Sequence, residues 1–308
     1  MDSMVSRLSQ SVYRLGPLGN PRVLSSYLIT DNKIAIIDCG PSSAIQELVE
    51  NIKSLSIDAA DIDFLALTHI HLDHAGGAAD FLKVFPNAKV LVPERGYKHL
   101  IDPKILNASS RPILGEHIFN SWGECKPVPA DKLEAVKPFQ TLELGETALQ
   151  YVPATGHAPH HNILTGSKDS IIFCADGLGM FDDESQSLTP TTPPPSFDMV
   201  QALKDIDMIE QMKAQKLCLA HFHEIQAGTQ FFDKVRLAYR SWAEITSKYV
   251  EKNAQRSSFE LSDYEKVFSE IVDKFPEYGR LPEFLKEQVL RVDVGGLLNH
   301  YSKPKRSP

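Results

Sequence analysis

The chain has 308 residues, of which 42% are hydrophobic and 23% are charged. This composition supplies enough apolar side chains for a sizeable core and excludes global disorder. The length allows one large domain, or one domain with an appendage. The formal net charge of −8 argues against a nucleic-acid-binding surface.

Nothing in the sequence indicates export or membrane insertion. No window approaches the ~18 consecutive apolar residues of a membrane span, and the first residues lack a basic segment followed by an apolar one. The four cysteines are far apart and form no Cys-x-x-Cys pair, as is typical of a reducing compartment. We therefore predict a soluble, cytoplasmic protein that binds neither membranes nor nucleic acids.

The first third of the chain alternates strand-like and helix-like patterns, which indicates an α/β fold. The Asp31-Asn32 pair predicts a tight turn between two strands, and Pro41 precedes a helix with helical apolar spacing. The expected strands cover residues 22–30, 33–38, 64–67 and 89–92. One expected helix begins near residue 41, and a second covers residues 75–84.

The middle of the chain is less regular. Residues 94–133 have no clean period and predict an inserted helical or looped segment, of the kind that often covers a pocket. Four prolines predict an exposed loop over residues 182–195, and Ser196 is expected to cap the helix that follows. The expected strands here cover residues 140–144, 148–152, 170–175 and 217–220.

The tail, residues 228–308, has no strand pattern. We predict amphipathic helices over residues 229–252, 262–275 and 281–301, with Ser262 and Glu265 forming a capping box. The predicted organisation is a catalytic domain, residues 1–227, and a helical C-terminal extension, residues 228–308. The extension is either a purely structural appendage, or it closes one wall of the substrate pocket or supports a homodimer.

The most informative segment, residues 68–77, reads THIHLDHAGG. It follows an apolar strand-like run and places three imidazoles and one carboxylate within six residues. Neutral imidazole and carboxylate are accepted as ligands by zinc, iron and manganese. His69 and His71 alternate by two, so an extended backbone turns both to one side. Asp73 and His74 lie beyond the strand and can serve a second ion.

Further candidate ligands lie just past other strand-like runs, where loops meet at one edge of a sheet. The complete set is His69, His71, Asp73, His74, His157, Asp176 and His221. Seven protein ligands exceed what one tetrahedral ion needs. They suit two adjacent divalent ions that share a carboxylate, and such ions lie about 3.5–4 Å apart.

These motifs resemble the metallo-β-lactamase superfamily, over about residues 10–225. The resemblance implies a four-layer αββα sandwich with His69, His71 and His157 at a first metal site. It implies Asp73, His74 and His221 at a second site, with Asp176 bridging the two ions. It also implies that Asp38 supports the metal loop without binding metal. We assign His161 a similar supporting role.

Within the superfamily, the helical tail resembles glyoxalase II and, more closely, the bacterial 2-aminobenzoylacetyl-CoA thioesterase. Residues 172–182, IFCADGLGMFD, and the long helix after the Pro-rich loop have counterparts there. His160 and His223 depart from the pattern, because small residues are common at both positions. Each is expected to make a supporting hydrogen bond or lie on the surface; a proton relay or a substrate contact is the alternative.

The leading hypothesis is a dinuclear metallohydrolase acting on a small acyl substrate. A metal-bound hydroxide would attack the carbonyl of an ester, thioester or lactone, with thioesters favoured by the tail. The metal would stabilise the oxyanion, and Asp73 would orient the nucleophile and pass a proton to the leaving group. Zinc is the expected metal, although iron and manganese accept the same ligands.

Three other classes stay open. A persulfide dioxygenase would use a single iron held by His69, His157 and Asp176, and flavodiiron proteins would need an appended flavin domain for which this tail has no strand pattern. A phosphodiesterase or nuclease is disfavoured by the acidic balance. A regulator would keep the metal site but act through its helical surface.

Overall fold

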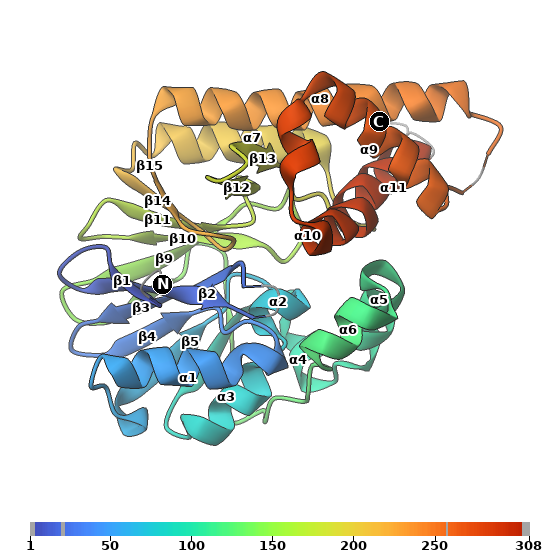
Figure 1. Ribbon diagram of the computed structural model, residues 1–308. Helices are drawn as coiled ribbons and strands as arrows, with labels where there is room; N and C mark the ends of the chain where they lie inside the picture. Colours follow the sequence, from blue (N-terminus) through green and yellow to red (C-terminus); the bar gives the residue numbers. More distant parts are fainter. Residues whose placement is uncertain (1–3, 20–21, 257, 304–308) are drawn as a thin grey trace. The chain divides into compact units, whose positions relative to one another are not determined.

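The computed structural model describes residues 4–19, 22–256 and 258–303 (Figure 1). It divides into two compact units, each assembled from separate stretches of sequence. The first comprises Met1–Pro153, His160–Ala175 and Lys213–Ala227, and the second comprises Ala154–Pro159, Asp176–Met212 and Gly228–Pro308. The division predicted after residue 227 coincides with one of these junctions. As a boundary between a catalytic domain and an extension it stays a prediction.

The first unit contains two mixed β-sheets. One has seven strands in sequence order: β1 Val5–Arg7, β2 Val12–Leu18, β3 Leu24–Thr30, β4 Ile34–Ile37, β5 Ile62–Ala66, β6 Lys89–Pro93 and β7 Leu133–Val136. The other has six strands in the order β15-β14-β11-β10-β9-β8: β15 Glu224–Gln226, β14 Lys216–Leu219, β11 Ile171–Ala175, β10 Asn162–Gly166, β9 Ala148–Pro153 and β8 Thr141–Glu143.

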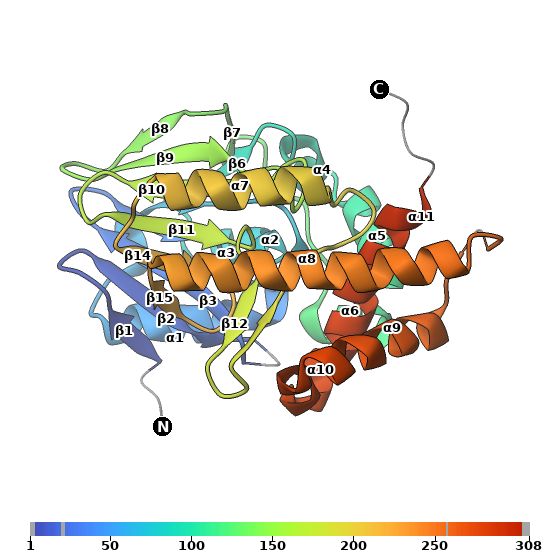
Figure 2. The same ribbon diagram turned by 90° about the horizontal axis from the view of Figure 1, so that it is seen from above.

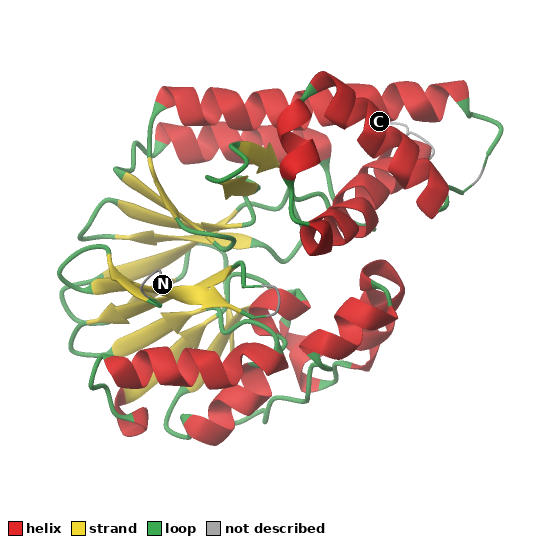
Figure 3. Ribbon diagram, viewed as in Figure 1, coloured by secondary structure: helices red, strands yellow, loops and turns green. Residues whose placement is uncertain are grey.

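The two sheets face one another across a shared apolar core (Figure 3). Tyr27 of β3 and Phe173 of β11 contact across it, with ring centroids 5.3 Å apart. Helices α1 (Ile45–Ser54) and α3 (Ala78–Val84) lie along the outside of the seven-stranded sheet (Figure 1). The apolar face of α1 is buried, as its helical spacing predicts. The predicted α/β class is confirmed.

Several strands of the first unit were not predicted from the sequence: β1, β2, β7, β10 and β15. Gly16-Pro17 interrupts the alternation of β2 and shifts its register against β3. The strand β10 follows directly on the second His cluster and carries only two aliphatic side chains. Short edge strands such as β1 and β15 depend on a neighbouring strand more than on their own pattern.

The helix predicted over residues 75–84 is wrong at its start. The chain forms a short helix α2 (Leu72–Ala75), then Gly76 and Gly77, and then α3. A Cβ at Gly77 would lie 2.6 Å from the Ile45 side chain of α1. The step between α2 and α3 thus lies where the chain approaches α1 closely.

The insertion between β6 and β7 is helical: α4 Tyr97–Ile101, α5 Lys104–Leu114 and α6 Glu116–Trp122. Pro112 lies inside α5, and Gly115 adopts a positive φ between α5 and α6. In the described parts of the chain, no helix has both the length and the apolar character needed to cross a membrane.

The second unit is mainly helical. In it, α7 (Met199–Gln211) and α8 (Thr229–Lys252) run side by side (Figure 2). The remaining elements are the hairpin β12 Met180–Asp182 and β13 Ser187–Thr189, the helices α9 Leu261–Lys274, α10 Glu283–Gln288 and α11 Gly295–Ser302, the 3-10 turn η3 Pro276–Arg280 and the π-helical turn η4 Val289–Val294. The third predicted tail helix is thus continuous from α10 to α11 through a π-helical turn.

The exposed Pro-rich loop predicted over residues 182–195 is wrong. Residues 187–193 are buried, partly in the β12–β13 hairpin. Two predicted caps are also wrong. Asp198, not Ser196, caps α7 by accepting a hydrogen bond from Gln201 N, and the capping box of α9 is formed by Glu260 and Asp263. Carboxylates bond to the first-turn amides in both cases.

Candidate metal centre

The metal loop, residues 68–77, begins where β5 ends. Leu67 N still donates to Leu91 O of β6 at 2.9 Å, which holds the loop to the sheet. The loop also bonds to the turn after β4, because Cys39 N donates to His74 O at 2.9 Å and Gly77 N donates to Gly40 O at 2.9 Å. His69 and His74 are consequently buried, with exposed fractions of 0% and 1%.

Asp38, at the end of β4, is the anchor of this loop. Its Oδ1 accepts from Thr68 N at 2.8 Å, and its Oδ2 accepts from Thr68 Oγ1 at 2.7 Å and from His74 Nδ1 at 2.8 Å. Thr68 Oγ1 has donated its proton to Asp38, so it accepts from His69 Nδ1 at 3.0 Å. One buried carboxylate therefore sets the tautomer of both rings and leaves their Nε2 atoms for a metal.

The predicted ligands of the first unit gather in two sets. His69 Nε2 lies 3.0 Å from His71 Nδ1. In the other set, Asp73 Oδ2 lies 3.7 Å from His74 Nε2 and 3.6 Å from His221 Nε2. His221 follows β14 and is 2% exposed, and the isolated bridge between Leu24 and His221 attaches this position to β3.

The second unit brings its two predicted ligands together. His157 Nε2 lies 3.3 Å from Asp176 Oδ2, and both side chains are buried. His157 Nδ1 donates to Thr191 O at 3.2 Å. The loop that carries His157 is held by α7, because Gly156 N donates to Asp205 Oδ2 at 2.7 Å. Burial raises the pKa of the Asp205 carboxyl.

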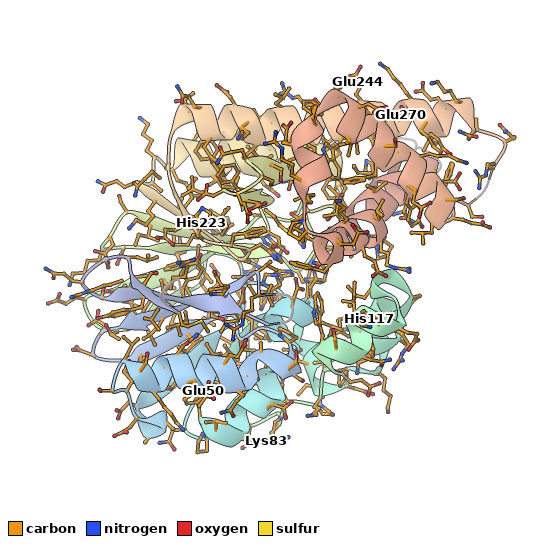
Figure 4. The ribbon with its side chains drawn as sticks, in the orientation of Figure 1. Glu50, Lys83, His117, His223, Glu244 and Glu270 are labelled. Atoms are coloured by element: carbon orange, nitrogen blue, oxygen red, sulfur yellow. The ribbon has the colours of Figure 1, made fainter. Side chains whose placement is uncertain are left out.

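Four of the other histidines divide into two kinds. His161 is fully buried, with its ring centroid 5.0 Å from that of His69, and His160 stacks on His69 at 6.0 Å. His223 is half-buried by β15 and His117 is exposed on α6 (Figure 4). The supporting role assigned to His161 stays a prediction.

The donors present fit divalent metal ions. Bonds of about 2.0–2.2 Å from a tetrahedral ion to N and O place neighbouring ligand atoms ~3.3–3.6 Å apart, and the distances within these sets run from 3.0 to 3.7 Å. Burial of the Asp176 carboxylate, 3% exposed, costs free energy that a cation would offset. These His and Asp clusters are candidate metal-binding groups.

Replacing Asp38 by asparagine is expected to weaken metal binding by about 10–100-fold while the fold is kept. The amide oxygen of asparagine still accepts a hydrogen bond. Its NH₂ group, however, is a donor and would face the donors of Thr68 and His74 where Asp38 has an acceptor. Zinc affinity, measured by competition with a chelator, tests this. Asp63→Asn is the matched control, since Asp63 accepts from Ile34 N at 2.8 Å outside the metal loop. Equal affinities in the two variants would contradict the role of Asp38.

Two contributors to the site were not predicted from the sequence. Thr68 links Asp38 to His69, and its place directly before the first histidine is a signal that could have identified it. Thr191 accepts from His157 but lies in the Pro-rich segment, where no local pattern marks it. Its role depends on a contact 34 residues along the chain.

Two known proteins are similar to this chain in sequence. The chain is 28% identical over 210 residues to the metallo-beta-lactamase fold-containing protein ST1585 of Sulfurisphaera tokodaii, covering 67% of this chain and 75% of that protein. It is 27% identical over 169 residues to the anaerobic nitric oxide reductase flavorubredoxin of Salmonella arizonae, covering 52% of this chain and only 30% of that protein.

Solved structures show the same fold. The structure of ST1585 from Sulfolobus tokodaii aligns with a TM-score of 0.64 and 24% identity, over 76% of this chain and 86% of that one. The metallo-beta-lactamase family protein TTHA1429 from Thermus thermophilus aligns with a TM-score of 0.64 and 19% identity, over 79% and 83%. Residues 19–221 match the sequence model of the metallo-beta-lactamase superfamily. The chain therefore belongs to the metallo-β-lactamase superfamily.

Proposed function

We propose that this protein is a dinuclear metal-dependent hydrolase of carboxylic esters, thioesters or lactones, with thioesters favoured. The observation that carries the proposal is the arrangement of ligand atoms from buried and half-buried side chains at distances that suit a shared ion. The preference for thioesters rests on the resemblance of the helical tail to glyoxalase II and to the 2-aminobenzoylacetyl-CoA thioesterase.

The proposed ligand assignment follows the superfamily pattern. His69, His71 and His157 would hold one ion, and Asp73, His74 and His221 would hold the other. Asp176 would be a ligand of both ions. Zinc is the favoured metal, since imidazole-rich tetrahedral sites suit it; iron and manganese accept the same donors.

When bound, the ions would lower the pKa of a coordinated water towards neutrality and polarise the acyl carbonyl. The chain's residues do the rest. Asp38 keeps the His69 and His74 rings in one tautomer, and Asp73 accepts the proton of the attacking water. The water oxygen bonds to the carbonyl carbon, the C–S or C–O bond breaks, and Asp73 returns the proton to the leaving thiolate or alkoxide.

The test is the metal content of the purified protein together with hydrolysis of acyl thioesters, lactones, carboxylic esters and phosphodiesters. We expect about two ions per chain, turnover of an acyl substrate, and loss of turnover after chelation that zinc restores. Turnover of phosphodiesters alone would move the protein to the nuclease class. Absence of bound metal after zinc loading would overturn the ligand assignment.

An oxidoreductase is the second candidate, because the flavorubredoxin of Salmonella arizonae and the flavo-diiron protein FprA2 of Clostridium acetobutylicum are among the relatives. The chain spans about a third of the length of each, so the likeness covers only part of those proteins. Iron in the purified protein without acyl hydrolysis would favour an oxidoreductase, and oxygen uptake on glutathione persulfide would assign it to the persulfide dioxygenases.

A further inference from the structure

The segment Thr191-Thr192, which follows β13, lies against both ligands of the second unit. It is buried, with exposed fractions of 5% for Thr191 and 0% for Thr192. Thr191 O accepts from His157 Nδ1 at 3.2 Å, and Thr191 Oγ1 donates to Asp176 O at 2.6 Å. Thr191 thus fixes the orientation of the His157 ring and also holds the backbone of Asp176.

Tyr239, on α8, bonds to Thr191. Thr191 N donates to the Tyr239 hydroxyl at 3.3 Å. Since Thr191 Oγ1 gives its own proton to Asp176 O, the Tyr239 hydroxyl donates to Oγ1, also at 3.3 Å. Burial raises the pKa of Tyr239 above its ordinary value, so the phenol keeps the proton this bond needs.

Asp293, on the π-helical turn η4, bonds to Thr192. Asp293 Oδ1 accepts from Thr192 N at 2.9 Å, and Asp293 O accepts from Thr192 Oγ1 at 2.7 Å. The second bond uses a main-chain carbonyl of the turn itself. Single π-helical turns inside α-helices are rare and recur at functional sites.

Gly296, on α11, fits against the same segment without a side chain. A Cβ at Gly296 would lie 1.6 Å from Thr192 O and 3.0 Å from Pro194 N. Glycine is therefore required by this close approach of two backbones. Three separate elements of the tail, α8, η4 and α11, thus contact the two threonines.

We propose that Tyr239, Asp293 and Gly296 are positioning residues, through which the C-terminal helices hold His157 and Asp176 in their metal-binding geometry. This inference rests on the proposed metal role of those two ligands. The tail acts through Thr191, whose carbonyl keeps the proton on His157 Nδ1 and leaves Nε2 as the ligand atom. This positioning role of the extension differs from closing one wall of the pocket or supporting a homodimer.

The experiment uses two variants of the full chain, Tyr239→Phe and Gly296→Ala. Tyr249→Phe is the control for the first, because Tyr249 is also on α8 and its hydroxyl donates to Asp263 at 2.7 Å, away from Thr191. Gly279→Ala is the control for the second, because its nearest neighbour to an added Cβ is the Val272 side chain at 3.4 Å.

Two quantities are measured: zinc affinity by chelator competition, and amide hydrogen exchange of Thr191 and Thr192 in metal-free protein. We expect Tyr239→Phe to lower zinc affinity about 10-fold, since it acts one contact beyond the ligand's own partner, and to speed exchange at Thr191. Gly296→Ala is expected to lower affinity at least as much. The two controls should keep wild-type affinity even where they lower the unfolding temperature.

The outcomes separate this inference from the proposed function. If wild-type protein binds zinc and Tyr239→Phe binds it equally well, the positioning role is overturned and the metal centre stands. If zinc affinity falls equally in Tyr249→Phe, the tail acts only through general stability, which also overturns the inference. If wild-type protein binds no zinc, the metal assignment itself fails. Should Gly296→Ala not fold, the Tyr239 pair decides.

Discussion

Replacing Asp176 by alanine is expected to reduce bound metal from about two ions per chain to less than one, and to abolish turnover. As the proposed bridging ligand, Asp176 would be lost from both ions at once. Its removal also leaves like-charged ions without the carboxylate between them. Metal content after dialysis against dilute zinc, measured by elemental analysis, tests this expectation.

Asp182→Ala is the matched control for this variant. Asp182 is also a buried aspartate of the second unit, 8% exposed, but it bonds to Ser185 at 2.6 Å in the β12–β13 hairpin. We expect Asp182→Ala to lower the unfolding temperature and to keep both ions. Retention of two ions by Asp176→Ala, with the control behaving as described, would contradict the bridging role.

Replacing Asp73 by alanine is expected to lower turnover by about 100-fold or more while one ion per chain is retained. The change removes one ligand of the second ion and also the carboxylate proposed to move the proton. Because His69, His71 and His157 are untouched, the first ion should stay bound. Steady-state rates on the best acyl substrate, with metal content on the same preparation, test both parts.

Asp102→Ala provides the comparison for Asp73. Asp102 is exposed between α4 and α5, where it pairs with Lys104 at 3.4 Å, so its loss should leave rate and metal content unchanged. Near-normal turnover in Asp73→Ala would remove Asp73 from the mechanism. Loss of both ions in that variant would contradict the expectation that the first ion stays bound without the second.

The metal loop shows how much the sequence determines locally. His69 and His71 are two residues apart at the end of an apolar strand, so the backbone period alone turns them to one side. Their ring nitrogens lie 3.0 Å apart, so the two rings do turn to the same side. The α/β class was predictable for a similar reason, because apolar residues recur along the sequence with the periods of strands and helices, 2 and 3.6 residues.

The Pro-rich segment shows the opposite case. Its composition predicts an exposed loop, yet Thr192 is fully buried, since its amide and hydroxyl bond to Asp293 at a separation of 101 residues. A local pattern reports only propensity, whereas burial depends on which distant element supplies the hydrogen-bond partners.

The fold class, the superfamily and the candidate ligands could be predicted from the residues, because these depend on side-chain type and short-range spacing. The contacts of Asp38 with Thr68 and His74, and the place of Thr191 between His157 and the helical tail, are seen only in the folded chain. Those contacts join residues far apart in the chain, and their geometry arises only when the backbone groups of separate elements satisfy one another.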